Sequence, residues 1–304
     1  MIKNEGENEP YLLTLVSNIN EDSKDLAPHQ KLMFYEAIGN MVSKEADYKK
    51  QSMYVQKMMS VIYDEWTKIF EEANKNPEVL LNTVNIRNID LILKINERVA
   101  FSAGTCYFSF GSYIYDNIIK MYSYYSNMVN QAYQTNNQFN STVKVIKITK
   151  RTILKFLQTL VKYNEDREGI LKFILPPLSG LIDQYRTSHF ENRDPDVLLV
   201  FSEILSKLKN AQYEYINSIW NYLCLFTLEM IKSDFQSFPE HRMNFFTLIK
   251  ALIFNAFDAL FQIQDSNFNK DVLNAIIWAF KHDQPLISET GLETLLILIN
   301  VTIL

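Results

Sequence analysis

The clearest pattern of apolar and polar positions lies between residues 238 and 282. Apolar side chains recur there at the i, i+3, i+4 and i+7 spacing of one α-helical face. The two stripes are Phe245, Leu248, Ile249 and Leu252, followed by Leu273, Ile276, Ile277 and Phe280. Pro239 suits the first turn of a helix, where its missing N–H costs no hydrogen bond. A polar segment over 264–269 supplies turn residues, so the pattern predicts a helical hairpin whose two apolar faces meet.

The same spacing continues in both directions and predicts helices through most of the chain. Asn76-Pro77-Glu78 combines a capping side chain, a proline and an acid, which is typical of a helix start. Pro176-Pro177 must kink or divide the helix that contains it. One helix holds too many tyrosines for a single face, so we expect it to pack on more than one side. The further helices expected are 9–20, 28–43, 46–75, 77–101, 106–133, 141–163, 165–187, 194–208, 212–235 and 285–304.

The helices recur in pairs. Every second helix begins near residue 28, 77, 141, 194, 238 or 285, at the long end of the spacing of HEAT and armadillo repeats. A single pair cannot bury its own apolar face, so neighbouring pairs must stack. We therefore predict an all-α fold: an α-solenoid of about six HEAT-type antiparallel helix pairs, forming a single array over residues 1–304.

Composition agrees with long helices, because the 304 residues include only 7 glycines and 8 prolines. A hydrophobic fraction of 47% is sufficient for a large core, and the net charge of −5 argues against direct binding of nucleic acid. Cys106 and Cys224 lie in apolar stretches, which predicts buried free thiols and fits a reducing compartment. The apolar windows are interrupted by charges, so we expect a soluble chain that does not enter a membrane.

Candidate chemistry is sparse. The sequence contains no GxxxxGK[ST], GxGxxG or HExxH motif. His241 and His282 could approach across the hairpin, but a zinc site needs three or four ligands. We therefore expect no enzyme activity, no cofactor and no metal site.

One charge pattern stands above the background. No acid interrupts residues 141–155, and four of the basic residues there follow a helical i, i+3, i+7, i+11 spacing. The stretch holds Lys144, Lys147, Lys150, Arg151 and Lys155. It is either a solvated helix face or a contact surface for an acidic partner or for the chain's own acidic segments.

Several ordered motifs resemble a known family. FPEHRMNFFTLIKA from Phe238 and IIWAFKH from Ile276 closely resemble the C-terminal half of the exportin-1 family, the chromosome region maintenance exportins of the importin-β superfamily. Further similar stretches are MFYEAIGNMV at 33–42, KRTILKFL at 150–157, ILPPLSGLIDQYR at 174–186, RDPDVLLVFSEILSKL at 193–208 and ETGLETLLILI at 289–299. The resemblance covers about residues 9–304, and within 79–140 it rests on helix register alone.

The resemblance implies HEAT repeats and a nuclear export receptor without enzyme activity. Such receptors bind cargo with a leucine-rich export signal together with Ran-GTP, contact nuclear pore proteins and shuttle between nucleus and cytoplasm. The resemblance also implies that the signal groove and the family's acidic loop lie upstream, and the terminal helix downstream. Six polar and aromatic residues carry the match in the hairpin, with a structural role expected and partner contact the alternative: Glu240, His241, Arg242, Trp278, Lys281 and His282.

The C-terminal end of the sequence is apolar. The last residues, LLILINVTIL, carry no charge, whereas a terminal repeat has a polar outer face. We expect a C-terminal fragment of a longer exportin, monomeric as a fragment. A HEAT-repeat scaffold without a nucleotide-switched partner is the alternative function, because a fold does not fix a function.

Overall fold

The computed structural model describes residues 11–209, 213–233, 237–263 and 268–303. Within these ranges the ordered elements are all helices, which confirms the all-α fold. Of the turn expected at 264–269, residues 264–267 lie outside the described residues, and α14 (Phe268–Phe280) already begins at Phe268. The chain divides into two compact units, Met1–Ile174 and Leu175–Leu304.

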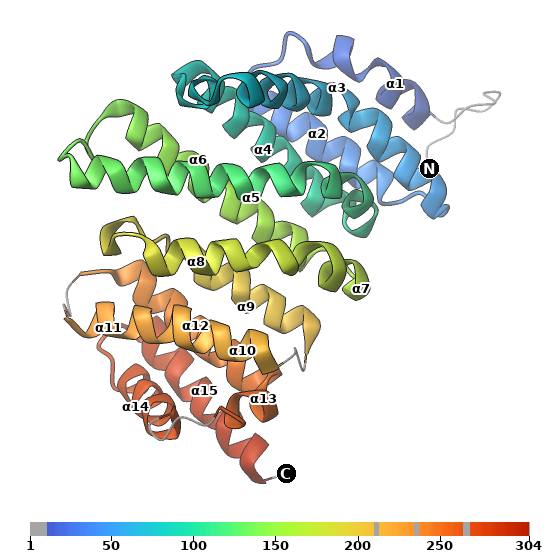
Figure 1. Cartoon of the computed structure of the whole chain (residues 1–304). Coiled ribbons are helices and arrows are strands. Elements are labelled where there is room, and N and C mark those ends of the chain that lie inside the picture. The colour runs from blue at the N-terminus through green and yellow to red at the C-terminus, as the bar shows by residue number, and fades with distance from the viewer. Residues whose placement is uncertain (1–10, 210–212, 234–236, 264–267, 304) are drawn as a thin grey trace. The chain divides into compact units, whose positions relative to one another are not determined.

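Unit 1 holds two layers of stacked helices (Figure 1). One layer contains α1 (Tyr11–Ser23), α3 (Tyr48–Lys75) and α5 (Thr105–Gln134). The other contains α2 (Pro28–Val42), α4 (Thr83–Ala103) and α6 (Ser141–Lys162). Since the chain alternates between the layers, each helix packs on its sequence neighbour and on the next helix of its own layer, as in an α-solenoid. The short α7 (Arg167–Gly169) and a π-helical turn, Ile170–Ile174, end the unit.

Unit 2 repeats the arrangement. Its central layer is α9 (Asp196–Leu208), α12 (Pro239–Asn255) and α15 (Pro285–Ile303), with α12 packed between the other two. Against this layer lie α11 (Leu225–Ser233) on α12 and α14 (Phe268–Phe280) on α15. The remaining helices are α8 (Ser179–Thr187), α10 (Tyr213–Ile219), which a π-helical turn at Trp220–Cys224 joins to α11, and the short α13 (Phe257–Phe261).

The predicted helix starts are confirmed in part. The helices α2, α6, α12 and α15 begin at or next to the expected residues. The expected start at Asn76 is wrong, because Asn76 caps only a 3-10 turn, Pro77–Leu81, and Asn82 caps α4 through the backbone N–H of Val84 at 2.9 Å. Pro176-Pro177 divides its helix as predicted: a 3-10 turn, Pro176–Leu178, separates the π-helical turn from α8.

The predicted hairpin differs from the structure in its second helix. Phe245, Leu248, Ile249 and Leu252 of α12 are all buried as expected, but α12 packs chiefly on α9 and α15. In α14, Leu273 and Ile277 are exposed, while Val272, Ala275, Ile276 and Ala279 are buried.

Small residues explain this rotation of α14. A Cβ at Gly291 of α15 would lie 2.3 Å from the backbone N of Phe280, so the two helices touch through backbone and alanine. The close approach turns the small face of α14 inward and leaves two larger side chains outside. In α15, Leu292, Leu296 and Ile299 are exposed.

The tyrosines of α5 join neighbouring elements, as the crowding of aromatic positions predicts. The hydroxyl of Tyr107 donates to Asn96 Oδ1 at 2.6 Å, that of Tyr115 to the carbonyl of Ile174 at 2.7 Å, and that of Tyr125 to the carbonyl of Leu80 at 3.1 Å. All three rings are buried. Since a buried hydroxyl needs a partner, each tyrosine fixes α5 against a specific backbone or side-chain group. Cys106 and Cys224 are both buried, as predicted, and are not joined in a disulfide.

A close contact between α2 and α4 lies at Gly39. A Cβ added there would lie 2.0 Å from Ser102 Oγ and 3.0 Å from Ser102 Cβ. The missing side chain of Gly39 thus lets the two helices meet near Ser102, whose hydroxyl donates to the carbonyl of Arg98 at 2.8 Å.

We predict that Gly39→Ala destabilises the chain by about 1–3 kcal/mol through overpacking, although glycine to alanine stabilises an open helix by about 1 kcal/mol. The free energy of unfolding in urea measures the effect. In a Ser102→Ala background the cost should fall, because the nearest atom is gone. An equal cost in both backgrounds would show that Ser102 does not limit the contact.

Candidate functional site

The basic stretch predicted at 141–155 lies on α6. Asn140 starts the helix by accepting from the backbone N–H of Thr142 at 2.8 Å, as an N-cap residue does. The apolar residues Ile146, Ile153 and Leu157 are buried, as helical spacing requires. Lys144, Arg151 and Lys155 are exposed on the other side of the helix, together with Ile148.

Two lysines of the stretch, Lys147 and Lys150, do not lie on this exposed surface. Lys150 is 1% exposed, with its Nζ 5.0 Å from the centre of the Tyr122 ring. Lys147 is half-buried, and its Nζ donates to the hydroxyl of Tyr133 at 2.7 Å. Both contacts reach tyrosines of α5, so these cations join α6 to the other layer. Sequence spacing could have separated Lys150, because it lies four residues after Ile146 and three before Ile153, within the buried stripe.

The seam between α4 and α6 carries polar contacts. Thr152 Oγ1 donates to Asp90 Oδ1 at 2.6 Å, and Thr159 Oγ1 donates to Glu97 Oε1 at 3.3 Å. The two carboxylates are seven residues apart, and so are the two threonines. Each pair has a sequence separation of 62 residues, so α4 and α6 run parallel in one register.

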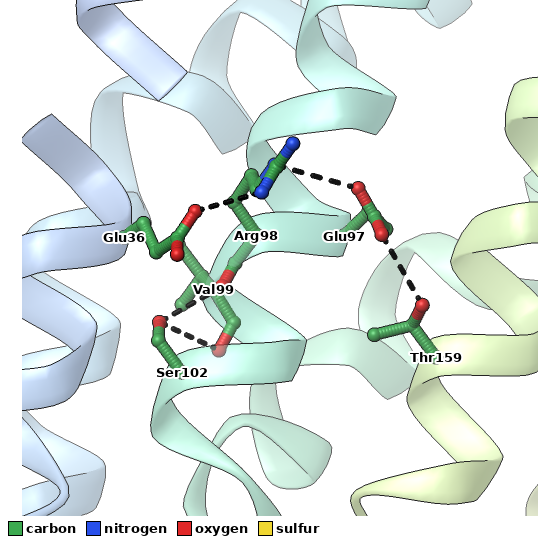
Figure 2. Close-up of polar contacts among 6 residues, drawn as sticks. All are labelled: Glu36, Glu97, Arg98, Val99, Ser102 and Thr159. Atoms are coloured by element: carbon green, nitrogen blue, oxygen red, sulfur yellow. Dashed lines mark hydrogen bonds and ion pairs between the residues drawn. The ribbon is translucent and has the colours of Figure 1, made fainter. Parts of the chain in front are cut away.

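The seam between α2 and α4 has the same separation. Arg98 Nη1 donates to Glu36 Oε2 at 2.9 Å across 62 residues. The Arg98 guanidinium also faces Glu97 Oε2 at 3.8 Å, so a polar chain runs from Glu36 through Arg98 and Glu97 to Thr159 (Figure 2). A fourth contact at this separation is aromatic: the Phe101 and Tyr163 rings meet edge to face, with centroids 4.9 Å apart.

Sequence reasoning missed this seam. The equal seven-residue spacing of acceptors on α4 and donors on α6 was a usable signal, since positions seven apart share a helix face. The spacing alone does not show that these residues touch, because the sequence does not show that α4 and α6 are neighbours in one layer.

The family-matching residues at the start of α12 pack inward. His241 is 7% exposed and its Nε2 lies 2.9 Å from the carbonyl of Arg193, which accepts the hydrogen bond. Burial lowers the pKa of His241 to about 4, although the bond to Arg193 opposes the shift. Arg242 is also buried, and its Nη2 donates to the carbonyl of Ser237 at 2.9 Å. Glu240 is exposed.

The matching residues at the end of α14 contact the same helix. The Trp278 ring meets Phe246 of α12 edge to face at 5.6 Å. His282 is buried beside Trp278, and its Nδ1 accepts from the backbone N–H of Gln284 at 3.0 Å. Burial and the nearby charge of Arg242 lower the pKa of His282. Lys281 is exposed.

The described ranges provide neither a metal centre nor a membrane-spanning helix. They contain no group of three or more His, Cys, Asp or Glu side chains placed to hold a metal ion. Among the same residues, no helix has both the length and the apolar character that crossing a bilayer requires. An open groove of about 500 Å³ lies between α1 and α3, lined by side chains such as Val16, Met53 and Lys57.

Lys150 and Lys155 form a matched pair for a stability test. We predict that Lys150→Ala lowers the free energy of unfolding by about 2 kcal/mol or more, because a buried side chain and its ring contact are lost. Lys155→Ala, on the exposed side, should change it by less than about 0.5 kcal/mol. Urea unfolding of both variants checks this, and equal effects would contradict the buried placement of Lys150.

The free energy of unfolding should depend on pH through His241. The folded-state pKa of His241 lies near 4, below the ordinary value of 6.5, so between these values the unfolded chain binds a proton that the folded chain does not. The stabilising contribution is therefore complete above pH 6.5 and is lost as pH falls toward 4, by up to about 3 kcal/mol. His241→Asn should flatten this part of the curve of unfolding free energy against pH. An unchanged slope would mean that the imidazole is accessible in the folded state.

Comparisons with known proteins identify the family. The family model described as CRM1 C terminal matches residues 112–303. EXPORTIN 1A of Arabidopsis thaliana is 34% identical over 295 residues, Exportin-1 of Dictyostelium discoideum 32% over 291 and Exportin-1 of Schizosaccharomyces pombe 30% over 299. These matches cover 95–97% of this chain and 27–28% of the relatives. The chain thus spans little more than a quarter of their length.

The hairpin motifs, the helix pairs and these matches agree, and they extend over nearly the whole chain. The chain belongs to the exportin-1 family of nuclear export receptors, and its residues 112–303 match the part that the CRM1 C-terminal model describes.

Proposed function

We propose that this chain is part of a nuclear export receptor that binds cargo carrying a leucine-rich export signal together with Ran-GTP. The supporting observation is family membership over 96% of the chain, with 34% identity to an Arabidopsis exportin. The proposal includes contact with nuclear pore proteins and shuttling between nucleus and cytoplasm. The chain contributes part of a single HEAT array, and its mechanism is non-covalent.

The two layers suit a role in coupling. In unit 1 each helix of the α2–α4–α6 layer contacts the next through both apolar packing and polar side chains, so a displacement of one helix acts on its neighbour. Binding of Ran-GTP and of cargo at separate surfaces can then be linked by a coupling free energy of about 1–3 kcal/mol. Such coupling distinguishes an export receptor from a scaffold.

A chimaera tests this proposal. This chain replaces the aligned segment of full-length Arabidopsis EXPORTIN 1A, and the affinity for a labelled leucine-rich signal peptide is measured with and without GTP-loaded Ran. We expect Ran-GTP to raise the affinity about tenfold or more. GDP-loaded Ran and a peptide with its leucines replaced by alanine are the controls.

The unaltered relative serves as the reference. If Ran-GTP enhances peptide binding by the relative and not by the chimaera, the chain lacks the proposed coupling and the scaffold function is favoured. A chimaera that unfolds at the same temperature as the relative separates this result from misfolding.

A further inference from the structure

We infer that the outward surface of α4 and α6 is a docking face for an acidic protein segment. We call it the basic face and define it by six residues, Arg87, Lys94 and Arg98 of α4 with Lys144, Arg151 and Lys155 of α6. The inference goes beyond the proposed function, because it concerns this surface alone and holds whether or not Ran-GTP is a partner.

The register of α4 and α6 brings the two sets of cations together. The contact of Asp90 with Thr152 and that of Glu97 with Thr159 fix two points on the seam. Lys94 falls between these points on α4, and Lys155 falls between them on α6. The basic face is therefore continuous across the seam and extends along both helices.

The acidic side chains at the seam are directed toward neighbouring helices. Glu36, Asp90 and Glu97 have side chains 27%, 16% and 18% exposed, and each bonds to a residue on a neighbouring helix. Lys94 and Arg98 are 43% and 46% exposed, and they pair with Asp90 at 2.7 Å and with Glu36 at 2.9 Å. The six cations of the basic face still outnumber the three acids. Every charged residue of α6 is a lysine or an arginine. The outward charge is thus positive on a chain whose net charge is −5.

The apolar residues on this surface favour a protein partner over nucleic acid. Ile148 is 55% exposed and lies one turn from both Lys144 and Arg151, and Val84 at the start of α4 is 64% exposed. A partner with carboxylates and apolar side chains can use both kinds of residue. A phosphate backbone would gain little from the exposed isoleucine and valine, so these two residues distinguish the two kinds of partner.

The test uses the whole chain and a synthetic amphipathic peptide with glutamates flanking leucines. We compare Arg151→Glu with Lys155→Glu, introduced together, against Lys57→Glu with Lys68→Glu, which reverse two exposed charges on α3. At low salt the first pair should weaken peptide binding about tenfold or more, and the loss should shrink as salt is added. The control pair should change the affinity less than about twofold, and circular dichroism confirms that both variants fold.

A further variant separates a protein partner from a general polyanion. Ile148→Asp should weaken the peptide and duplex DNA unequally, with the larger loss for the peptide. Three results would overturn the inference: no peptide binding by the unaltered chain, equal losses in both charge-reversed variants, or duplex DNA binding as tightly as the peptide at the same salt.

Discussion

The close, parallel packing of α2, α4 and α6 is the constraint on which unit 1 depends. Gly39 allows α2 to meet α4 at Ser102, and polar contacts between the helices repeat at a separation of 62 residues. The stabilising free energy comes mainly from burial of apolar side chains, since half-exposed ion pairs contribute about 0–1 kcal/mol each. The polar contacts instead select one register, because sliding either helix would leave carboxylates facing apolar residues.

That register also determines what the surface presents. The acids of the seam bond to residues of neighbouring helices, while Arg87 and Lys155 are exposed. Two other lysines of α6 reach the tyrosines of α5, where they join the layers. A single basic sequence segment thus divides into a packing part and a surface part.

The sequence predicted the helices, their pairing and the family, because each rests on local periodicity and on ordered motifs. It failed where a second helix decides the outcome. The buried face of α14 differs from the predicted stripe because Gly291 and Ala279 permit backbone contact, which apolar periodicity does not encode. The helix α4 begins later than predicted because two asparagines, Asn76 and Asn82, can both act as N-caps. Only the second is followed by a long helix. The basic pattern predicted Lys150 at the surface, but its position along the helix lies within the buried apolar stripe.

The seven-residue spacing of the contacts at Thr152 and Thr159 has a mechanical consequence. Two contacts about 10 Å apart along a helix axis resist sliding of α6 past α4, since any shift would break both together. They offer little resistance to rotation about the line that joins them. The junction should therefore be stiff in shear and compliant in bending, so that thermal motion changes the angle between neighbouring helices while their alignment is preserved.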